Sequence, residues 1–153
     1  MLHIKVKSFL EIKTQELYNI LQLRSEVFVV EQNCVYQDID GKDKKALHVL
    51  VYKNDKLVGY TRLFKPGDYF DLASIGRVVV VEHERKNKYG YMLMETSINA
   101  IRKYFKVSKI KISAQEHLKH FYNNCGFIEY GKPYLEDGIP HIMMLWLIKT
   151  KSS

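Results

Sequence analysis

Three basic side chains, Arg85, Lys86 and Lys88, occupy a short polar segment that could bind an anion. The segment follows four consecutive valines, Val78–Val81, which predict a buried strand. From Met94 onward, apolar residues recur at helical spacing, which predicts a helix of about four turns. The start of a helix presents unpaired backbone N–H groups at the positive end of its dipole. We therefore expect this turn to bind a phosphate-bearing ligand.

Arg24 and Glu31 could form a second charged site, on the apolar face of a predicted N-terminal helix. Arg24 lies seven residues after Leu17, and Glu31 lies seven residues after Arg24, so the three share one helical face. A guanidinium on an apolar face needs a carboxylate or an anionic ligand. We expect an internal Arg24–Glu31 ion pair. A substrate pocket that has this pair as its floor is the alternative.

Two patterns suggest a metal ion, and neither is sufficient. The loop Asp38–Asp43 resembles a calcium loop, but Gly41 is at its fourth position rather than its sixth. In addition, Val49 occupies the position of the bidentate glutamate, so we exclude calcium. His117 and His120 could share a metal, but no other residues supply the remaining ligands. We therefore expect no metal site.

The composition is typical of a globular protein with one domain, which we expect to span residues 1–153. Hydrophobic residues make up 46% and charged residues 27% of the chain, and no apolar run approaches the ~20 residues of a membrane span. The N-terminus lacks the apolar stretch of a signal peptide. Cys34 and Cys125 supply neither a metal set nor a disulfide framework. A cytoplasmic protein is the expectation.

The chain is basic, with a net charge of +7 and a pI of about 9.3. This balance suits a polyanionic partner, either a CoA-like nucleotide or a nucleic acid. The lysines are scattered through the sequence, so we interpret much of the charge as solvated surface. Nucleic-acid binding would require basic and aromatic residues clustered on one face, and the sequence shows no such cluster.

The remaining patterns predict alternating strands and helices. A hairpin is expected around a turn at Asn54 and Asp55. In chain order, we expect a strand at 2–7, a helix from Thr14 through Phe28, hairpin strands at 48–52 and 57–64, a strand at 75–81, the long helix, a strand at 110–114, a short helix ended by Gly126, a turn at 134–141 and a last strand at 142–148.

Two of these segments resemble motifs of the GNAT acetyltransferase superfamily. The run from Arg85 to Gly90 resembles its Arg/Gln-x-x-Gly-x-Gly/Ala motif, whose amides hold the pyrophosphate of acetyl-CoA. Lys88 replaces the middle glycine, so either the turn is less strained here or the lysine itself contributes to anion binding. Tyr122, four residues before Gly126-Phe127, resembles the superfamily's tyrosine motif, and Gln115 stands where an asparagine is frequent.

A closer resemblance, from about Leu17 to Met144, is to the ElaA-type proteins of this superfamily. It implies an α/β (α+β) GNAT fold: a mixed, mostly antiparallel sheet of six or seven strands flanked by helices. The sheet would be splayed between the strands at 78–81 and 110–114 to admit acetyl-CoA. The resemblance is carried by Leu23-Arg24-x-x-Val27-Phe28-Val29-Val30-Glu31-Gln32-x-Cys34-x-Tyr36-x-Asp38-x-Asp40-Gly41, Ile75-Gly76-Arg77-Val78, Ala114-Gln115-x-His117-Leu118 and Glu136-Asp137-Gly138-Ile139-Pro140-His141.

The resemblance also implies where acetyl-CoA, the co-substrate, would bind. The backbone of the valine strand would pair with the pantetheine arm like an added strand. The turn and the start of the following helix would hold the pyrophosphate. The implied acetyl-CoA-binding residues are Val78, Val79, Val80, Arg85, Lys86, Asn87, Lys88, Tyr89, Gly90, Tyr91 and Gln115.

The implied reaction is N-acetylation of a primary amine by direct attack on the thioester. Such a site needs a base for the ammonium proton and an acid for the departing thiolate. Tyr122 resembles the superfamily's general acid. No base is comparably marked, and a hydrogen-bonded structural role is the commoner one for each histidine. The candidates for the base are Glu31, Glu116, His117 and His141. Of these, Glu31 and His117 join Tyr122 as the catalytic candidates. The candidates for contact with the acceptor are Arg24, Glu31 and His141.

Two other classes of function stay open at this point. Acyl-homoserine-lactone synthases share the splayed fold and have an early Arg-x-x-x-Phe like Arg24 to Phe28. Failure to bind acyl-carrier protein would argue against that class. The other class is a non-catalytic CoA-binding module. Either a monomer or a homodimer fits the sequence, which does not identify the amine acceptor.

Overall fold

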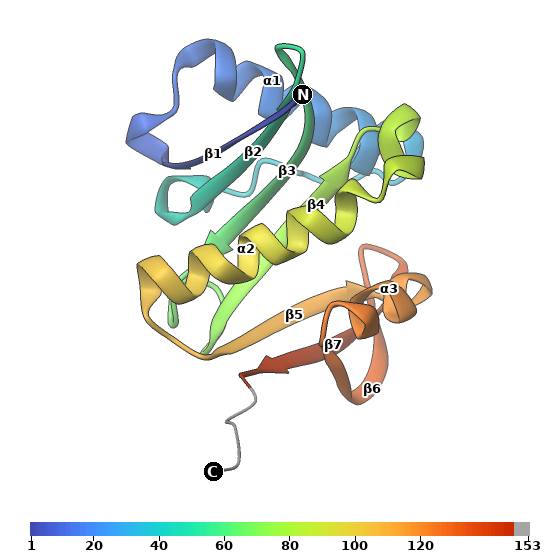
Figure 1. Cartoon of the computed structure of the whole chain (residues 1–153). Coiled ribbons are helices and arrows are strands. Elements are labelled where there is room, and N and C mark those ends of the chain that lie inside the picture. Colours follow the sequence, from blue (N-terminus) through green and yellow to red (C-terminus); the bar gives the residue numbers. More distant parts are fainter. Residues whose placement is uncertain (149–153) are drawn as a thin grey trace.

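The structure is a computed structural model that describes residues 1–148. A seven-stranded mixed sheet forms the centre of the protein (Figure 1). The strand order across the sheet is β1-β2-β3-β4-β5-β7-β6. All neighbouring pairs are antiparallel except β4 and β5, which are parallel. The strands are β1 (Leu2–Ser8), β2 (Leu47–Lys53), β3 (Lys56–Phe64), β4 (Ala73–Val80), β5 (Lys109–Gln115), β6 (Ile128–Glu136) and β7 (Ile139–Leu147).

The first four strands form an antiparallel half of the sheet, as the sequence predicts. The β2–β3 hairpin turns at Asn54 and Asp55, whose φ angles are 50° and 68°. Positive φ at both central residues is the requirement of a type I′ turn, and Asn and Asp adopt it more readily than most residues. The predicted hairpin is therefore confirmed.

The sheet splays between β4 and β5. These strands pair only at Ala73 with Ile110 and at Ser74 with Lys111, and beyond those pairs they diverge (Figure 1). The register between β3 and β4 shifts close to Arg77, where φ is 50°, so β4 carries a bulge at this point. A bulge bends its strand and increases the local twist. The prediction of a mixed sheet that splays between these two strands is confirmed.

The other half of the sheet contains a strand that the sequence patterns did not indicate. The segment 134–141 is predicted as a turn, but the reversal needs only Asp137 and Gly138, with φ angles of 51° and 77°. β6 and β7 extend on either side of it. Gly131 and Pro133 argue against a strand in the sequence of β6, because both residue types are uncommon in strands. Both residues lie in an irregular stretch of an edge strand, where glycine and proline are tolerated.

In the described part of the chain, three α-helices connect and cover the sheet: α1 (Thr14–Arg24), α2 (Tyr89–Phe105) and α3 (Lys119–Asn124). The predicted first helix continues beyond α1 as a π-helical segment, Ser25–Glu31. Its wider winding persists past Glu31, since the N–H of Cys34 bonds to the carbonyl of Val29 at 3.0 Å. π-helical turns occur frequently at functional sites. Within residues 1–148, every helix is too short or too polar to cross a bilayer.

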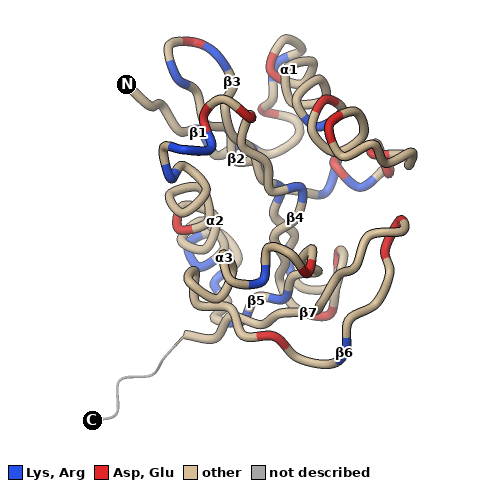
Figure 2. Tube along the Cα trace, turned by 90° about the vertical axis from the view of Figure 1, so that its right-hand side faces the viewer, with Lys and Arg blue, Asp and Glu red and all other residues tan. Residues whose placement is uncertain are grey.

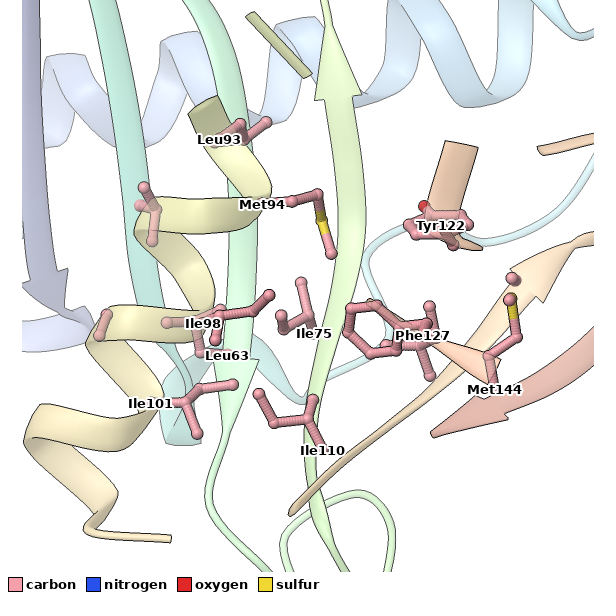
Figure 3. Close-up of a cluster of buried hydrophobic side chains, with 14 of the residues drawn as sticks. Leu63, Ile75, Leu93, Met94, Ile98, Ile101, Ile110, Tyr122, Phe127 and Met144 are labelled. Carbon is pink, nitrogen blue, oxygen red and sulfur yellow. The ribbon is translucent and has the colours of Figure 1, made fainter. Parts of the chain in front are cut away.

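The main hydrophobic core lies between α2 and the sheet. Met94 and Ile101 of α2 pack with Ile75 of β4 from one half of the sheet, and with Phe127 and Met144 from the other half (Figure 3). A smaller core, formed by Ile20, Leu23, Val27, Phe28, Leu50, Tyr60 and Val79, lies beneath α1 on the opposite face of the sheet. The two halves therefore share one core below the splay, which fixes how far apart β4 and β5 stand.

Candidate active site

A cavity of about 740 Å³ occupies the splay between β4 and β5. Its walls come from the π-helical segment and the loop after it, β4, the start of α2, the end of β5 and the β6–β7 turn. The lining residues are Val27, Phe28, Glu31, Gln32, Cys34, Tyr36, Ile75, Gly76, Arg77, Val78, Val79, Val80, Arg85, Lys88, Gly90, Tyr91, Ile112, Ser113, Gln115, His117, Leu118, Phe121, Tyr122, Glu136, Asp137, Ile139 and His141.

The basic turn predicted to bind an anion borders this cavity. It is a 3₁₀ segment, Glu82–Asn87, followed by Lys88, and α2 begins directly after Lys88. Lys88 adopts a left-handed conformation with φ 58° and ψ 24°. The turn therefore keeps the backbone shape that a glycine would adopt without strain, and the alternative of a less strained turn is wrong.

Gly90 makes a close contact with Phe121 inside the site. A Cβ atom at this position would lie 3.1 Å and 3.2 Å from two ring carbons of Phe121. A side chain here would force the Phe121 ring, which itself lines the cavity, to shift by a few tenths of an ångström. Gly90 and Tyr122 line the same cavity.

Only some of the predicted acetyl-CoA residues reach the cavity. Lys86, Asn87 and Tyr89 do not line it. Asn87 instead donates to Glu84 at 2.7 Å, and Glu84 also accepts two hydrogen bonds from Lys53 at 3.1 Å and 3.2 Å. The hydrogen bonds from Lys53 lower the pKa of Glu84. These contacts tie the turn to the β2–β3 hairpin. The predicted residues that do line the cavity are Val78, Val79, Val80, Arg85, Lys88, Gly90, Tyr91 and Gln115.

The predicted Arg24–Glu31 ion pair is wrong. Arg24 is fully buried, lies outside the cavity lining, and bonds to Asp38 at 2.9 Å and to Asp43 at 2.8 Å. Glu31 bonds instead to Arg85 at 2.7 Å. The prediction assumed regular α-helical winding between residues 24 and 31. The π-helical segment winds more widely, so Glu31 turns away from the face of Arg24 and toward the cavity.

The acidic loop that resembled a calcium site supplies counter-ions for arginines. Besides Arg24, Arg62 bonds to Asp43 at 3.0 Å and also to Asp40, and Arg77 lies 2.8 Å from Asp38. Burial opposes ionisation of Asp43, but its hydrogen bonds with the two buried arginines outweigh burial and lower its pKa. The cluster fixes the 38–43 loop against β3 and β4, which positions the preceding residues along the cavity wall.

Tyr122 of α3 lines the cavity with 7% of its surface exposed, and it lies in the buried cluster close to Phe127 (Figure 3). Its ring packs edge-on against Phe121 and Phe127. Burial, and secondarily the neighbouring Cys125, raises the pKa of the Tyr122 phenol. Within residues 1–148 the hydroxyl forms no hydrogen bond. The phenol thus keeps its proton at neutral pH and has no internal partner for it.

The other predicted polar residues are distributed around the opposite wall. His117 is solvent-exposed and lines the cavity, whereas Glu116 does not line it. The Gln115 amide faces Gln32 across the splay, with donor–acceptor distances of 3.4 Å in both directions. His141 is buried and its Nε2 lies 3.2 Å from a carboxylate oxygen of Glu136. The structure therefore brings Gln115, His117 and His141 together with Tyr122 in one cavity.

Several cavity residues were missed because their motifs gave no direct signal. Arg77 and Ser113 line the cavity but lie within predicted strands, where a polar side chain is normally interpreted as pointing to solvent. Glu136 could have been found from the sequence. The pair Asp137-Gly138 is a strong signal for a tight hairpin, which would place Glu136 close to His141 on the returning strand.

The chain's positive charge is spread over the molecule. Lys and Arg positions are interspersed with Asp and Glu positions along most of the elements (Figure 2). Around the cavity, the cationic residues Arg85 and Lys88 lie at the turn before α2. Glu31 pairs with Arg85 at that end of the cavity, and Lys88 adds a further positive charge there that suits an anion.

Comparisons with known proteins agree with this geometry. A family model described as "Acetyltransferase (GNAT) domain" matches residues 11–148. Protein ElaA of Escherichia coli (strain K12) is 46% identical over 136 residues, which are 88% of this chain and 89% of that protein. The crystal structure of Escherichia coli ElaA has a TM-score of 0.89 at 42% identity, covering 95% of this chain and 99% of that chain.

Two further solved structures share the fold. An acyl-CoA N-acyltransferase from Pseudomonas aeruginosa has a TM-score of 0.90 at 38% identity, covering 95% of this chain and 99% of that chain. An aminoglycoside 6′-N-acetyltransferase complexed with coenzyme A has a TM-score of 0.73 at 16% identity, covering 97% and 99% of the two chains. The resemblance to ElaA-type proteins is thereby confirmed, and the chain belongs to the GNAT acetyltransferase family.

Proposed function

We propose that this protein transfers the acetyl group of acetyl-CoA to a primary amine by direct attack within a ternary complex. The observation that carries the proposal is the composition of one cavity. It joins the unpaired edge of β4, a cationic helix start and the buried Tyr122 phenol. These three features suit, in turn, an extended amide-bearing arm, a pyrophosphate and a leaving thiolate.

The pantetheine arm would lie along β4. From Ile75 onward β3 is the only strand that pairs with β4 within residues 1–148, and Arg85 Nε donates to the carbonyl oxygen of Val80 at 3.0 Å. The other edge of β4 before Val80 is therefore available for main-chain-like hydrogen bonds. The amides at the start of α2 and the charges of Arg85 and Lys88 would hold the pyrophosphate. A related fold that binds coenzyme A, the aminoglycoside 6′-N-acetyltransferase, supports this choice of ligand.

In the reaction, the nitrogen lone pair of the acceptor attacks the thioester carbon, and the carbon–sulfur bond then breaks. The departing sulfur takes the phenol proton of Tyr122, and the phenol is reprotonated by the nitrogen, which loses a proton as the amide forms. Because burial keeps Tyr122 protonated, the phenol is ready to donate when the thiolate departs. Arg24 has no contact with the cavity, so we assign it to the cavity's support and not to the acceptor.

Thermal melting with coenzyme A tests the ligand. Coenzyme A at a hundred times its dissociation constant should stabilise the fold by about 2.7 kcal/mol, which for a chain of this size is about 5–10 °C in melting temperature. Pantetheine alone should give a smaller shift, because it lacks the pyrophosphate. An unchanged melting temperature in saturating coenzyme A would contradict the proposal. The acceptor is then sought with a panel of a small amine, an amino sugar, a peptide amino terminus and a lysine peptide.

A further inference from the structure

Five polar side chains share one face of the sheet beside the cavity. His141 of β7 lies directly opposite Gln115 of β5 on one side and Tyr134 of β6 on the other. Ser113 and Glu136 are each two residues along their strands from those partners, so they point to the same face. The sheet register therefore gathers these groups at the end of the splay.

The hydrogen bonds of His141 define which ring nitrogen carries the proton. Its Nδ1 lies 2.7 Å from the carbonyl oxygen of Ile139. A carbonyl oxygen can only accept, so Nδ1 must donate, and in the neutral ring Nε2 is left with a lone pair. The side chain is 8% exposed, and this backbone contact holds the ring orientation.

The Nε2 lone pair faces a second acceptor. It lies 3.2 Å from Oε2 of Glu136, while the other carboxylate oxygen of Glu136 accepts from Ser113 at 3.2 Å. Ser113 is in turn hydrogen-bonded to the hydroxyl of Tyr134, so the carboxylate is held from behind. Two facing acceptors repel each other unless a donor lies between or beside them. In the neutral ring, a bound group with several N–H donors and a positive charge satisfies both acceptors, whereas a second proton on the ring would pair it directly with Glu136.

We propose that His141 Nε2 and Glu136 Oε2 bind the ammonium group of the acceptor, and that His141 is the general base that removes its proton. The inference rests on the proposed function, and it identifies the acceptor as a protonated amine that enters past the β6–β7 turn. Glu136 is a positioning residue, because it orients the ammonium and stabilises the imidazolium without taking part in bond making.

The proton balance is complete with these residues. The acceptor enters as R–NH₃⁺, and His141 Nε2 takes one proton to leave R–NH₂ with its lone pair free. After attack on the thioester, the nitrogen gives a second proton that replaces the one donated by Tyr122 to the sulfur. The imidazolium releases its proton to solvent beside Glu136, whose side chain is 44% exposed. The products are the amide, the thiol and one solvent proton.

The other candidate bases are less suited by their contacts. The carboxylate of Glu31 is engaged by Arg85 at 2.7 Å, so Glu31 orients this arginine at the turn before α2. His117 is exposed and forms no ring hydrogen bond within residues 1–148 that would fix its tautomer. The ionisable groups that face His141 are Glu136 and Tyr134, both from β6, while β5 presents the uncharged Gln115.

Nitrogen-15 NMR of histidine-labelled protein tests the inference without turnover. Of the six histidines, His141 is assigned from the signal lost in His141→Asn, a change that keeps an N–H donor near Ile139. With coenzyme A bound, we expect the tautomer that the Ile139 contact favours, with the proton on Nδ1 and a lone pair on Nε2. Butylammonium chloride should shift the Nε2 signal, whereas tetramethylammonium chloride, which has no N–H donor, should not. A doubly protonated ring at neutral pH, or the same response to both ions, would overturn the proposal.

Kinetics with the best amine of the acceptor panel provide the second test. His141→Asn should lower kcat/KM at neutral pH by about 10²–10⁴-fold, and the loss should shrink by about tenfold per pH unit as the amine loses its own proton. The exposed His120 lies outside the cavity, and His120→Asn is the matched control, with unchanged kinetics. Glu136→Gln should raise KM for the amine by roughly tenfold and leave KM for acetyl-CoA unchanged.

The outcomes separate this inference from the proposed function. If no amine is acetylated by the wild-type protein, the function is refuted, and the NMR experiment still decides whether the site binds an ammonium. If acetylation occurs but the loss in His141→Asn does not depend on pH, His141 has a structural role only. If His117→Asn shows the pH-dependent loss instead, the base is His117 and the proposal is wrong.

Discussion

Two buried tyrosines provide a paired test of the site, because their hydroxyl groups have opposite environments. Tyr122 lines the cavity, and its hydroxyl has no hydrogen-bond partner within residues 1–148. The hydroxyl of Tyr60 is fully buried outside the cavity, 2.6 Å from Nδ1 of His48. Removing each oxygen with Tyr→Phe should therefore affect activity in one case and stability in the other.

For Tyr122→Phe, the structure predicts a loss of catalysis with an intact fold. The ring keeps its packing against Phe121 and Phe127, and no internal hydrogen bond is lost, so the free energy of unfolding should change by no more than about 0.5 kcal/mol. Losing a general acid costs about 10²–10⁴-fold in kcat, or about 2.7–5.4 kcal/mol of transition-state stabilisation.

For Tyr60→Phe, the structure predicts the reverse. His48 Nε2 lies 2.9 Å from the carbonyl oxygen of Asp43, so that nitrogen donates and Nδ1 accepts the Tyr60 proton. Burial lowers the pKa of His48 and keeps the ring neutral, so Nδ1 has no proton of its own to donate. Tyr60→Phe leaves Nδ1 of His48 without a hydrogen-bond donor, which should lower the free energy of unfolding by about 1–3 kcal/mol. This loss corresponds to about 2–12 °C in melting temperature.

The two variants are compared by thermal melting and by steady-state kinetics with coenzyme A release as the readout. Tyr122→Phe with full turnover would refute the acid role and leave Tyr122 as a packing residue. Tyr122→Phe that fails to fold would show that its hydroxyl makes a structural hydrogen bond. The loss in kcat is smaller where departure of the thiolate does not limit the rate, so a single-turnover measurement accompanies kcat.

Two further predictions concern charged groups. Asp43→Asn, which leaves Arg24 and Arg62 short of one buried carboxylate, should destabilise the fold by about 3–5 kcal/mol by urea unfolding, whereas the exposed Asp71→Asn should change it by under about 1 kcal/mol. The pKa of Asp43 is lowered in the fold from its ordinary value of 3.8, so this stabilisation is complete above that pH and declines as the pH falls below it. Equal losses of unfolding free energy in Asp43→Asn and Asp71→Asn would contradict the role of Asp43 as a buried counter-ion. Lys88→Gly relieves a positive φ and should stabilise the fold by up to about 1 kcal/mol, yet weaken coenzyme A binding in low salt more than in high salt. Lys86→Ala, outside the cavity lining, is the matched control, and an equal loss in both would show that distance from the cavity does not matter.

The sequence was sufficient wherever a local pattern determines a local structure. The hairpin turn at Asn54 and Asp55, the valine strand and α2 follow from residue type and spacing, and all are present. The cationic turn was placed correctly because a strand, a polar segment and a helix in succession leave little freedom for it. Gly126, predicted as the end of a short helix, has φ 97° and lies two residues after Asn124, where α3 ends.

The sequence was insufficient where the partner of a group lies far along the chain. Arg24 was assigned to Glu31 on helical periodicity alone, but its carboxylates come from a loop 14 and 19 residues away. Neither the π-helical segment nor the bulge at Arg77 has a clear composition signal. Both features reorient side chains toward the cavity, so the lining of the site had to be read from the structure.

The gap in the hydrogen bonding between β4 and β5 also bears on how the protein behaves without its ligand. Sheets are usually vulnerable to self-association at their two outer strands, but this one has two additional unprotected strand edges in its interior. An extended segment of another polypeptide can form the same backbone hydrogen bonds as a pantetheine arm. Bound coenzyme A would thus occupy the free strand edge at the splay and prevent the addition of a strand from another molecule. Preparations depleted of it should precipitate sooner, and short β-forming peptides become a rational starting point for competitive inhibitors.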